Sequence, residues 1–467
     1  MSLGATSRQD PAFESWLEGQ LLHSASAMLS SISPVSIVKH RPGFGQTVRP
    51  VAGAIVASPV LGDYNPDPDY FFHWFRDSAV VIDALRLLYA DGRIGAEALR
   101  HLRDFTRFSL ALNGLDGRAI AAVPDRRARV APELLQYLRE DQDLASIHGD
   151  AVVAETRVNP DGTLDILRWA RPQHDGPPLR ALALLRWVAG GHLVDAGLLA
   201  EVTSLIRFDL GFTLRHWREP SFDIWEEESG HHYYTLRVSA AALAEGAVWL
   251  ENQGDTAQAQ RCREESQAVL RQLDGYWVDD RDAAHGYYRS RVLADGGPGA
   301  KALDIAVILS AIHSIGTGAE HGPGGPGDPR MQATLARLDA LFDEAYPINH
   351  GRAAGRGAAM GRYAGDVYCS GGAYYFSTLG AAEFCFRAAA ADSGDEHQRN
   401  QWIERGDAYL ATVRACTPAS GDLSEQFDQR SGEQTSAKQL AWSHAAFISC
   451  VSARRIALAA CQAPRQR

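Results

Sequence analysis

The stretch TLRVSAAALAEGAVWLENQGDTAQAQRCREESQAVLRQL, residues 235–273, carries two helical repeats separated by only two residues. Apolar and small side chains recur at helical spacing over 235–252 and again over 255–273, which predicts two amphipathic helices. The Gln-Gly pair at 253–254 allows only a tight turn, so the two helices are expected to be antiparallel neighbours. An antiparallel helix pair is therefore the predicted building unit of the fold.

Helical periodicity continues along nearly the whole chain, and convincing strands are few. The further apolar stripes cover 12–33, 77–90, 94–112, 178–190, 195–216, 301–315, 330–345, 372–391, 397–414 and 437–461. Together with the two helices above, they predict about twelve helices. The protein is therefore expected to be all-α.

The connections between these helices alternate in length. Tight connections lie near 91–93, 191–194, 253–254 and 392–396, whereas 34–76, 113–177, 217–234, 274–300, 346–371 and 415–436 are long and rich in Gly, Pro and aromatics. The Gly/Pro-rich stretch at 316–330 is the exception. Antiparallel pairs arranged in a ring give this alternation and place the long loops on one face. We therefore predict one domain over residues 1–467, an (α/α)6 barrel, with a site on the loop face.

Composition excludes several classes of function. The formal net charge of -11, without any Lys/Arg run, argues against nucleic-acid and anionic-membrane partners. The first thirty residues contain Asp10, Glu14 and Glu18 and show no signal peptide or anchor, which predicts a cytoplasmic protein. The six cysteines form no CxxC pair, and His231 and His232 lack a third ligand at suitable spacing. Neither a metal nor an organic cofactor is expected.

Acidic and aromatic residues gather on the predicted long loops. The clearest segments are PDPDYFFHWFRDSAVV (66–81), LRWARPQHDG (167–176), SFDIWEEESG (221–230) and LSEQFDQRSGEQTSAKQLAW (423–442). Taken singly, Asp77 is typical of a charge at a helix terminus and Trp169 of core packing. Two carboxylates on separate loops of one face, however, suit glycoside hydrolysis, in which one protonates the leaving oxygen and the other activates water or attacks the sugar.

Three consecutive glutamates, Glu226, Glu227 and Glu228, follow Trp225. An isolated run of this kind is usually a solvated face, but the flanking aromatic residues are not typical of one. If the three share a partly desolvated pocket, they cannot all ionise at low cost, so one is expected to keep a proton and act as the general acid. Spacing alone does not choose among them. Aromatic rings able to stack on a sugar are Tyr70, Trp74, Trp169, Trp225 and Tyr363.

The last predicted helix has a start signal of its own. Ser436 is followed three residues later by Gln439, which is similar to a capping box. The helix is therefore predicted to begin directly after Ser436 and to leave Glu425 in the preceding loop.

The four segments and GRYAGDVY (361–368) resemble, in order, five segments of the glucoamylase family, the inverting exo-acting α-glucosidases with an (α/α)6 barrel. The resemblance spans residues 68 to about 447. It implies that Glu226 is the general acid and that Glu425 is the general base. The residues that it implies bind sugar or support the site are Tyr70, Trp74, Arg76, Asp77, Trp169, Arg171, Asp223, Trp225, Glu227, Arg362, Asp366 and Trp442.

The resemblance also implies an activity: release of β-glucose from the non-reducing ends of α-glucans or malto-oligosaccharides, with no cofactor. Inversion by single displacement predicts that the two carboxyl groups lie about 6.5–9.5 Å apart. The sequence shows no β-rich starch-binding module, so soluble oligosaccharides are the expected partners. The sequence leaves the oligomeric state open.

Several positions depart from the family pattern, where further sugar units are expected to bind. They are Gly372, Ala373 and Tyr374, which replace a frequent Asn-Pro-Trp, and Phe72, Phe75 and His174. A preference for α-1,6 linkages, as in isomalto-oligosaccharides or dextran, is therefore a second hypothesis. A relative acting on trehalose or transferring sugar to phosphate is a third, and a glucan-binding protein without catalysis is a hypothesis of another class.

Overall fold

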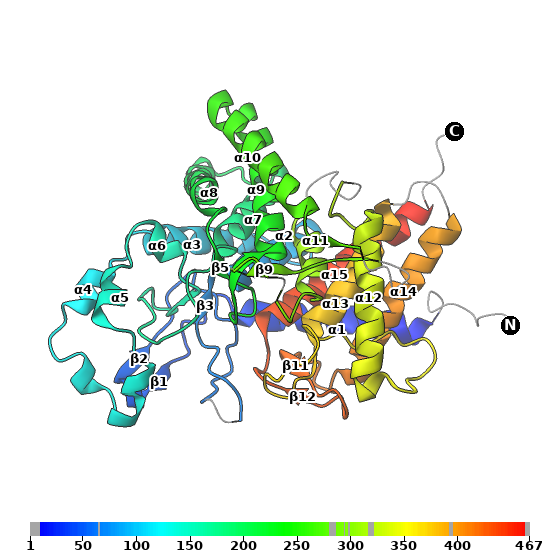
Figure 1. Ribbon diagram of the computed structural model, residues 1–467, viewed down its shortest axis with the longest axis horizontal. Coiled ribbons are helices and arrows are strands. Elements are labelled where there is room, and N and C mark those ends of the chain that lie inside the picture. Colours follow the sequence, from blue (N-terminus) through cyan, green and yellow to red (C-terminus); the bar gives the residue numbers. More distant parts are fainter. Residues whose placement is uncertain are drawn as a thin grey trace.

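The computed structural model describes residues 10–63, 66–279, 286–293, 295–297, 299–315, 322–391 and 396–462 (Figure 1). The predicted helices are present in this part of the chain, and twelve of them have eight residues or more. These are α1 (Pro11–Ser30), α2 (Phe75–Ala90), α3 (Glu97–Leu112), α7 (Gly176–Ala189), α8 (Ala196–His216), α9 (Tyr233–Asn252), α10 (Thr256–Asp274), α11 (Ala306–His313), α12 (Pro329–Ala345), α13 (Tyr375–Ala391), α14 (Glu396–Cys416) and α15 (Ala441–Gln462).

Six of these helices form a closed inner ring. In order around the ring they are α2, α7, α9, α11, α13 and α15, and α15 packs back against α2. The other six, α1, α3, α8, α10, α12 and α14, form an outer layer. Five of them pack against an inner helix next to them in sequence, and α1 packs against α15, the helix that closes the ring. The chain thus alternates between outer and inner helices, which confirms the predicted (α/α)6 barrel.

Each long connection leads from an outer helix to an inner one. These connections cover 31–74, 113–175, 217–232, 275–305, 346–374 and 417–440. They carry the short helices α4 (Gly117–Ala121), α5 (Asp141–Ala145) and α6 (Asp150–Val153), and the 3-10 helices η2 (Pro42–Phe44), η3 (Arg127–Arg129), η4 (Pro132–Tyr137) and η6 (Pro347–Asn349). The Gly/Pro-rich stretch predicted at 316–330 falls between α11 and α12, and its residues 316–321 lie outside the described residues.

Small antiparallel sheets tie these loops together. Their strands are β1 (Lys39–Arg41), β2 (Gln46–Val48), β3 (His73–Trp74), β4 (Arg157–Val158), β5 (Ser221–Phe222), β6 (Ser229–His232), β7 (Trp277–Val278), β8 (Tyr287–Tyr288), β9 (Arg291–Leu293), β10 (Ala373–Tyr374), β11 (Gln426–Phe427) and β12 (Gln434–Thr435). The strand orders are β1-β2, β3-β4, β5-β6-β9, β7-β8 and β10-β11-β12. Pairing such as His73 with Val158 fixes loops from distant parts of the sequence against one another.

Four of the six outer helices begin with a capping aspartate. Asp10, Asp195, Asp255 and Asp328 cap the outer helices α1, α8, α10 and α12, because each carboxylate accepts a hydrogen bond from a first-turn amide. The inner helices α2, α9 and α11 start without a hydrogen bond from the side chain at the cap position. Their positive N-terminal ends therefore face the loops directly, where they favour carboxylates.

The start of α15 differs from the prediction. The helix begins at Ala441, because Ser436 and Gln439 have φ angles of 63° and 48°, in the left-handed region that a helix cannot contain. The predicted capping box is therefore wrong, and the Ser436 hydroxyl donates to the Glu425 carboxylate instead. By length and composition α15 could cross a membrane, but it belongs to the inner ring and 56% of its apolar window is buried.

Candidate active site

A pocket opens among the long loops at the N-terminal ends of the inner helices. Eleven of the fourteen predicted site residues line it: Tyr70, Trp74, Arg76, Asp77, Trp169, Trp225, Glu226, Glu227, Arg362, Glu425 and Trp442. Of the other three, Asp223 and Asp366 are buried and do not line the pocket, and Arg171 lines a neighbouring pocket. We call this the main pocket.

Stacked aromatic rings close the floor of the main pocket. Phe376 and Trp442 stack with ring centroids 4.4 Å apart and planes within 7°, and the Trp225 ring stacks on Phe376 at 6.1 Å. A separate cavity on the barrel axis lies beneath and shares Phe376 and Trp442 with the main pocket. The two rings therefore separate the main pocket from the barrel interior, and the pocket is blind.

Asp223 organises the turn that presents Glu226. Its Oδ1 accepts hydrogen bonds from the amides of Trp225 at 3.1 Å and Glu227 at 2.9 Å, and its carbonyl accepts one from the amide of Glu226. Glu226 has a φ of 65°, which this turn holds in place. Asp223 is itself buried and pairs with Arg291 at 2.7 Å. The position of Glu226 thus depends on a residue that does not reach the pocket.

Three N–H donors converge on the carboxylate of Glu226. Trp74 Nε1 donates at 2.8 Å and Arg76 Nη2 at 3.2 Å, both to Oε1, and Trp169 Nε1 donates to Oε2. The guanidinium of Arg157 lies 3.7 Å from the centre of the Trp169 ring and supports one face of it. Trp169 thus contacts the predicted general acid directly, in agreement with the supporting role that the resemblance implies.

Arg76 is surrounded by three carboxylates. Its guanidinium lies 3.2 Å from Asp77, 3.5 Å from Asp175 and 3.2 Å from Glu226. Burial raises the pKa of both aspartates, that of Asp175 to about 6, and the charge of Arg76 only partly offsets these increases. A single cation does not neutralise three anions, so repulsion among these carboxylates and their burial oppose the ionisation of Asp77 and Asp175. The sequence analysis missed Asp175, although it stands inside the quoted segment, just before the proline-rich start of α7.

Glu425 has hydroxyl partners instead of cationic ones. Tyr70 donates to its Oε1 at 3.1 Å and to its Oε2 at 3.3 Å, and Ser436 also donates to Oε2. Tyr368, which the prediction omitted, lies 2.9 Å from the Tyr70 hydroxyl and lines the pocket. Burial raises the pKa of Glu425 to about 7, although hydrogen bonds from Ser436 and Tyr70 and the charge of Arg362 oppose the shift.

The three consecutive glutamates do not share one pocket, which corrects the prediction from their sequence. Glu228 points away from the main pocket and pairs with Arg291 at 2.9 Å. Glu227 lines the pocket and pairs with Lys301 at 2.5 Å and Arg362 at 2.9 Å. Burial opposes ionisation of Glu227, yet these cations outweigh it and lower its pKa. Repulsion within the run is therefore relieved by separate cations.

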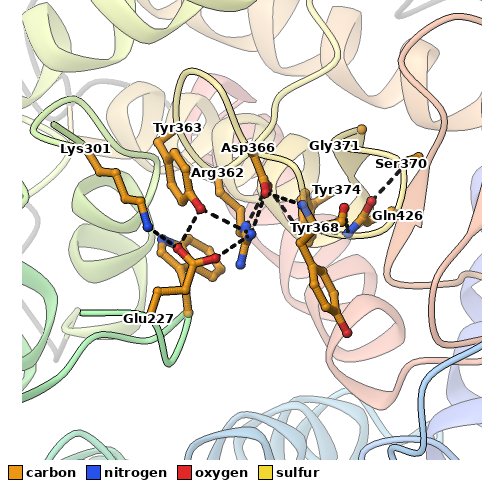
Figure 2. Close-up of polar contacts among 12 residues, drawn as sticks. Glu227, Lys301, Arg362, Tyr363, Asp366, Tyr368, Ser370, Gly371, Tyr374 and Gln426 are labelled. Atoms are coloured by element: carbon orange, nitrogen blue, oxygen red, sulfur yellow. Dashed lines mark hydrogen bonds and ion pairs between the residues drawn. The ribbon is translucent and has the colours of Figure 1, made fainter. Parts of the chain in front are cut away.

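Figure 2 shows how Arg362 is held between two carboxylates. It donates to Asp366 through Nε at 2.6 Å and Nη2 at 2.5 Å, and to Glu227 through Nη2 at 2.9 Å. Tyr363 donates to Glu227 at 2.5 Å, so its hydroxyl serves this network although its ring does not line the pocket. The hydroxyl of Tyr374 donates to Asp366 at 3.3 Å. Arg362 therefore presents a fixed guanidinium to the pocket.

Arg171 lies outside the main pocket and lines a neighbouring pocket, so its contact with sugar stays a prediction. Its Nε donates to Glu155 at 2.6 Å and its Nη2 to Asp165 at 3.2 Å. The departures from the family pattern are also placed differently from the prediction. Five of the departing residues have buried side chains that do not line the main pocket: Phe72, Phe75, His174, Ala373 and Tyr374. Any contact with further sugar units must come from other residues.

The described residues contain no group of three or more His, Cys, Asp or Glu side chains that could hold a metal ion. All six cysteines are free, and four of them, Cys262, Cys385, Cys416 and Cys450, are buried. The chemistry offered by the main pocket is therefore that of carboxylates, tyrosine hydroxyls, arginines and indole rings.

The comparisons with known proteins agree with this geometry. The sequence pattern of glycosyl hydrolases family 15 matches residues 43–109 and 157–452. Glucoamylase 1 of Rhizopus oryzae is 25% identical over 505 aligned positions, which cover 97% of this chain and 74% of that protein. A probable glucoamylase of Schizosaccharomyces pombe is 27% identical over 442 positions, which cover 86% of this chain and 85% of that protein.

Solved structures show the same fold. The glucoamylase of Hormoconis resinae matches with a TM-score of 0.74 and 27% identity over 94% of this chain and 73% of that chain. The glucoamylase of Saccharomycopsis fibuligera matches with a TM-score of 0.76 over 97% of both chains, at 21% identity.

An (α/α)6 barrel with a blind, carboxylate-bearing pocket lined by indole rings defines this protein as a glycoside hydrolase. Within that class, the matched residues make up well over half of the chain. The chain belongs to glycosyl hydrolases family 15 and is a glucoamylase-like enzyme.

Proposed function

We propose that the protein removes single glucose units from the non-reducing ends of α-glucans and malto-oligosaccharides, with inversion. Glu226 gives a proton to the glycosidic oxygen, and Glu425 takes one from the water that attacks the opposite face of the sugar. Arg76, Asp77 and Arg362 bind the hydroxyls of the terminal glucose. The related proteins named glucoamylases support a glucan substrate.

The observation that carries this proposal is the contrast between the two carboxylates in one pocket. Glu425 is held by hydroxyl groups and its raised pKa, about 7, suits a base that exchanges protons near neutral pH. Glu226 has no such hydroxyl partners: it belongs to the carboxylate cluster around Arg76 and receives N–H donors from Trp74 and Trp169, and we assign it the transfer of a proton to the leaving oxygen. The closed floor admits only a chain end, which makes the attack exo-acting. The separation of about 6.5–9.5 Å between the two carboxyl groups stays a prediction.

The test is proton NMR of the first sugar anomer released from maltose, isomaltose and trehalose. We expect β-glucose from maltose, isomaltose or both. Glu226→Gln should lose about 10²–10⁴-fold in rate, because the leaving oxygen is no longer protonated. The matched control is Glu228→Gln, two residues away and outside the pocket, which should keep the wild-type rate within about threefold.

Early release of α-glucose from the first two sugars would overturn the proposed roles of Glu226 and Glu425. Release from isomaltose alone would support the hypothesis of an α-1,6 preference. Binding of a sugar without turnover would support a glucan-binding protein.

A further inference from the structure

A further pocket borders one inner and one outer helix of the barrel. It lies among the first two turns of α9, the last turns of α10, β8 and the loop before α12. Its lining includes Tyr233, Arg237, Arg271, Asp274 and Tyr288. None of these residues lines the main pocket, so this cavity is a separate one, which we call the α9–α10 pocket.

Arg237 lines this pocket and is buried without an ion pair. The residue is only 6% exposed, and its Nε is completely buried and has no hydrogen-bond partner. Within the described part of the chain, no hydrogen bond or ion pair holds the rest of the guanidinium either. Burial lowers the pKa of Arg237, and the charges of Glu245 and Asp328 offset this decrease only in part. Arg237 is therefore a buried cation without a direct counter-ion.

The other buried arginines show what Arg237 lacks. Nine arginines of the described residues are buried, and eight of them lie within 3.2 Å of a carboxylate. Examples are Arg180 with Asp209 at 2.7 Å and Arg454 with Asp407 at 2.6 Å. A buried cation without a counter-ion is costly, so the chain supplies an anion in these eight cases. At Arg237 it supplies none, which points to an anion from solution.

Two carboxylates near the pocket already have partners of their own. Asp274, which lines the pocket, pairs with Arg330 at 2.7 Å. Asp328 accepts hydrogen bonds from the amides of Gly324 at 2.8 Å and Arg330 at 2.9 Å, and thereby caps α12. Since these contacts hold both carboxylates away from Arg237, its positive charge is left to the pocket.

The pocket offers an anion further hydrogen-bond donors. Arg271 lines it from α10 and is exposed, and no ion pair holds it within the described residues. Burial raises the pKa of Tyr233, so its hydroxyl keeps a proton, and it donates only to the weak acceptor Sδ of Met331 at 3.8 Å. Gly324 covers the Nε side of Arg237, where an added Cβ would lie 2.9 Å from Nε. An anion in the pocket therefore has to bind at Nη1 and Nη2.

We propose that the α9–α10 pocket binds a phosphate group, held by Nη1 and Nη2 of Arg237, by Arg271 and by the hydroxyl of Tyr233. The forked guanidinium matches two oxygens of a phosphate. A dianion also balances both arginines, whereas a single carboxylate would leave one positive charge uncompensated. Leu270 and Pro323 line the same pocket and can pack on the organic part of a phosphate monoester. The inference is independent of the proposed function, because no residue of the main pocket takes part.

Calorimetric titration with inorganic phosphate, near neutral pH and at constant ionic strength, tests the proposal. Arg237→Met removes the buried cation and should weaken binding at least about tenfold. Arg271→Gln removes an exposed cation and should weaken binding about threefold, because solvent screens its charge. Arg261→Met, at an exposed position of α10 outside the pocket, is the control and should bind phosphate within about twofold of the wild type.

Thermal unfolding gives an independent readout. Without phosphate, Arg237→Met should unfold at or above the wild-type Tm, because it removes a buried charge that no carboxylate neutralises. Saturating phosphate should raise the wild-type Tm by about 3 °C and that of Arg237→Met by less than about 1 °C. The variant also corrects for the general stabilisation that phosphate gives to proteins. A Tm of Arg237→Met several degrees below the wild type without phosphate would show that the chain itself stabilises this cation, and would overturn the inference.

Two further ligands identify the source of the phosphate group. Tighter binding of phenyl phosphate than of inorganic phosphate indicates a phosphate monoester, and equal or weaker binding indicates the free ion. Acetate that binds as tightly as phosphate would overturn the choice of a phosphate group.

Two results would overturn the inference as a whole. One is the absence of phosphate binding to the wild type, and the other is equal binding by the wild type and Arg237→Met, with circular dichroism showing that the variant is folded. If Arg237→Met does not fold, Arg271→Gln decides the question, and unchanged binding by that variant overturns the inference.

Discussion

The hydroxyl of Tyr70 donates to both carboxylate oxygens of Glu425, at 3.1 and 3.3 Å, although 355 residues separate the two in sequence. Four residues further along the same loop, Trp74 donates to Glu226 at 2.8 Å. The Tyr70 and Trp74 rings lie 5.2 Å apart. The loop that leads into α2 therefore contacts both proposed catalytic carboxylates and sets their relative position.

The first prediction concerns pH. A general base must be ionised, and burial raises the pKa of Glu425 to about 7, so kcat/KM should fall as the pH drops through about 7. The fall should approach about tenfold per pH unit on the acid side. Steady-state kinetics from pH 4 to pH 9 on the best disaccharide provides the measurement. A profile that stays flat down to the ordinary glutamate range would contradict the burial of Glu425 or its role.

Ser436→Ala should shift the acid-side fall of kcat/KM, which we call the acid limb, to higher pH. The Ser436 hydroxyl donates to Glu425 and thereby lowers the pKa of the carboxyl, so its removal favours the protonated form. A hydrogen bond to a charged group contributes about 1.5–3 kcal/mol, which makes a shift of about one pH unit reasonable. Ser420→Ala, at an exposed turn of the same loop, is the control and should leave the limb in place. If Ser436→Ala lowers the maximum of kcat/KM but leaves the pH of the acid limb unchanged, Ser436 supports the structure of the site and not the pKa of Glu425.

Replacement of Arg362 should affect both substrate binding and stability. Arg362→Met leaves Asp366 buried without its cation, which should cost about 3–5 kcal/mol of unfolding free energy. It also removes a donor from the main pocket, so KM should rise. Arg362→Lys should recover part of the stability but not KM, because an ammonium cannot reproduce the forked contacts at 2.6 and 2.5 Å. Urea unfolding and steady-state kinetics test the two effects separately.

Arg291 should contribute mainly to stability. It is buried and pairs with Asp223 at 2.7 Å and Asp304 at 2.5 Å, which are also buried. Arg291→Met is expected to destabilise the protein by about 3–5 kcal/mol in urea unfolding. Arg261→Met, at an exposed position on α10, should be close to neutral. A small loss for Arg291→Met would show that the two carboxyl groups are protonated in the folded protein.

The barrel could be predicted because helical periodicity and connection length are local properties of the chain. The two-residue gap at 253–254 became the tight turn between α9 and α10, and the long loops all lead into inner helices. The boundaries were less accurate. α11 spans Ala306–His313 instead of 301–315, because the apolar residues before it belong to the loop that carries Asp304.

The candidate site could be predicted only in part, because hydrogen bonds between distant loops leave no periodic signal. Ser436 was assigned to a helix cap, whereas its hydroxyl binds Glu425. Asp175 stands beside Pro-rich sequence, and only the fold places it 3.5 Å from Arg76. The three glutamates were expected to repel one another, but cations from other parts of the chain pair with each of them: Arg76 with Glu226, Lys301 and Arg362 with Glu227, and Arg291 with Glu228.

The ring closes only when α15 packs against α2, and this order of assembly has a consequence for biosynthesis. Glu425 and Trp442 are supplied by the last part of the chain, whereas Tyr70 and Trp74 are supplied near its beginning. A ribosome that has translated the first ten helices has therefore made most of the barrel wall but no complete pocket. The apolar faces of α2 and α13 stay uncovered until α15 emerges from the ribosome, so the nascent chain must avoid aggregation until then and has no complete pocket before that point.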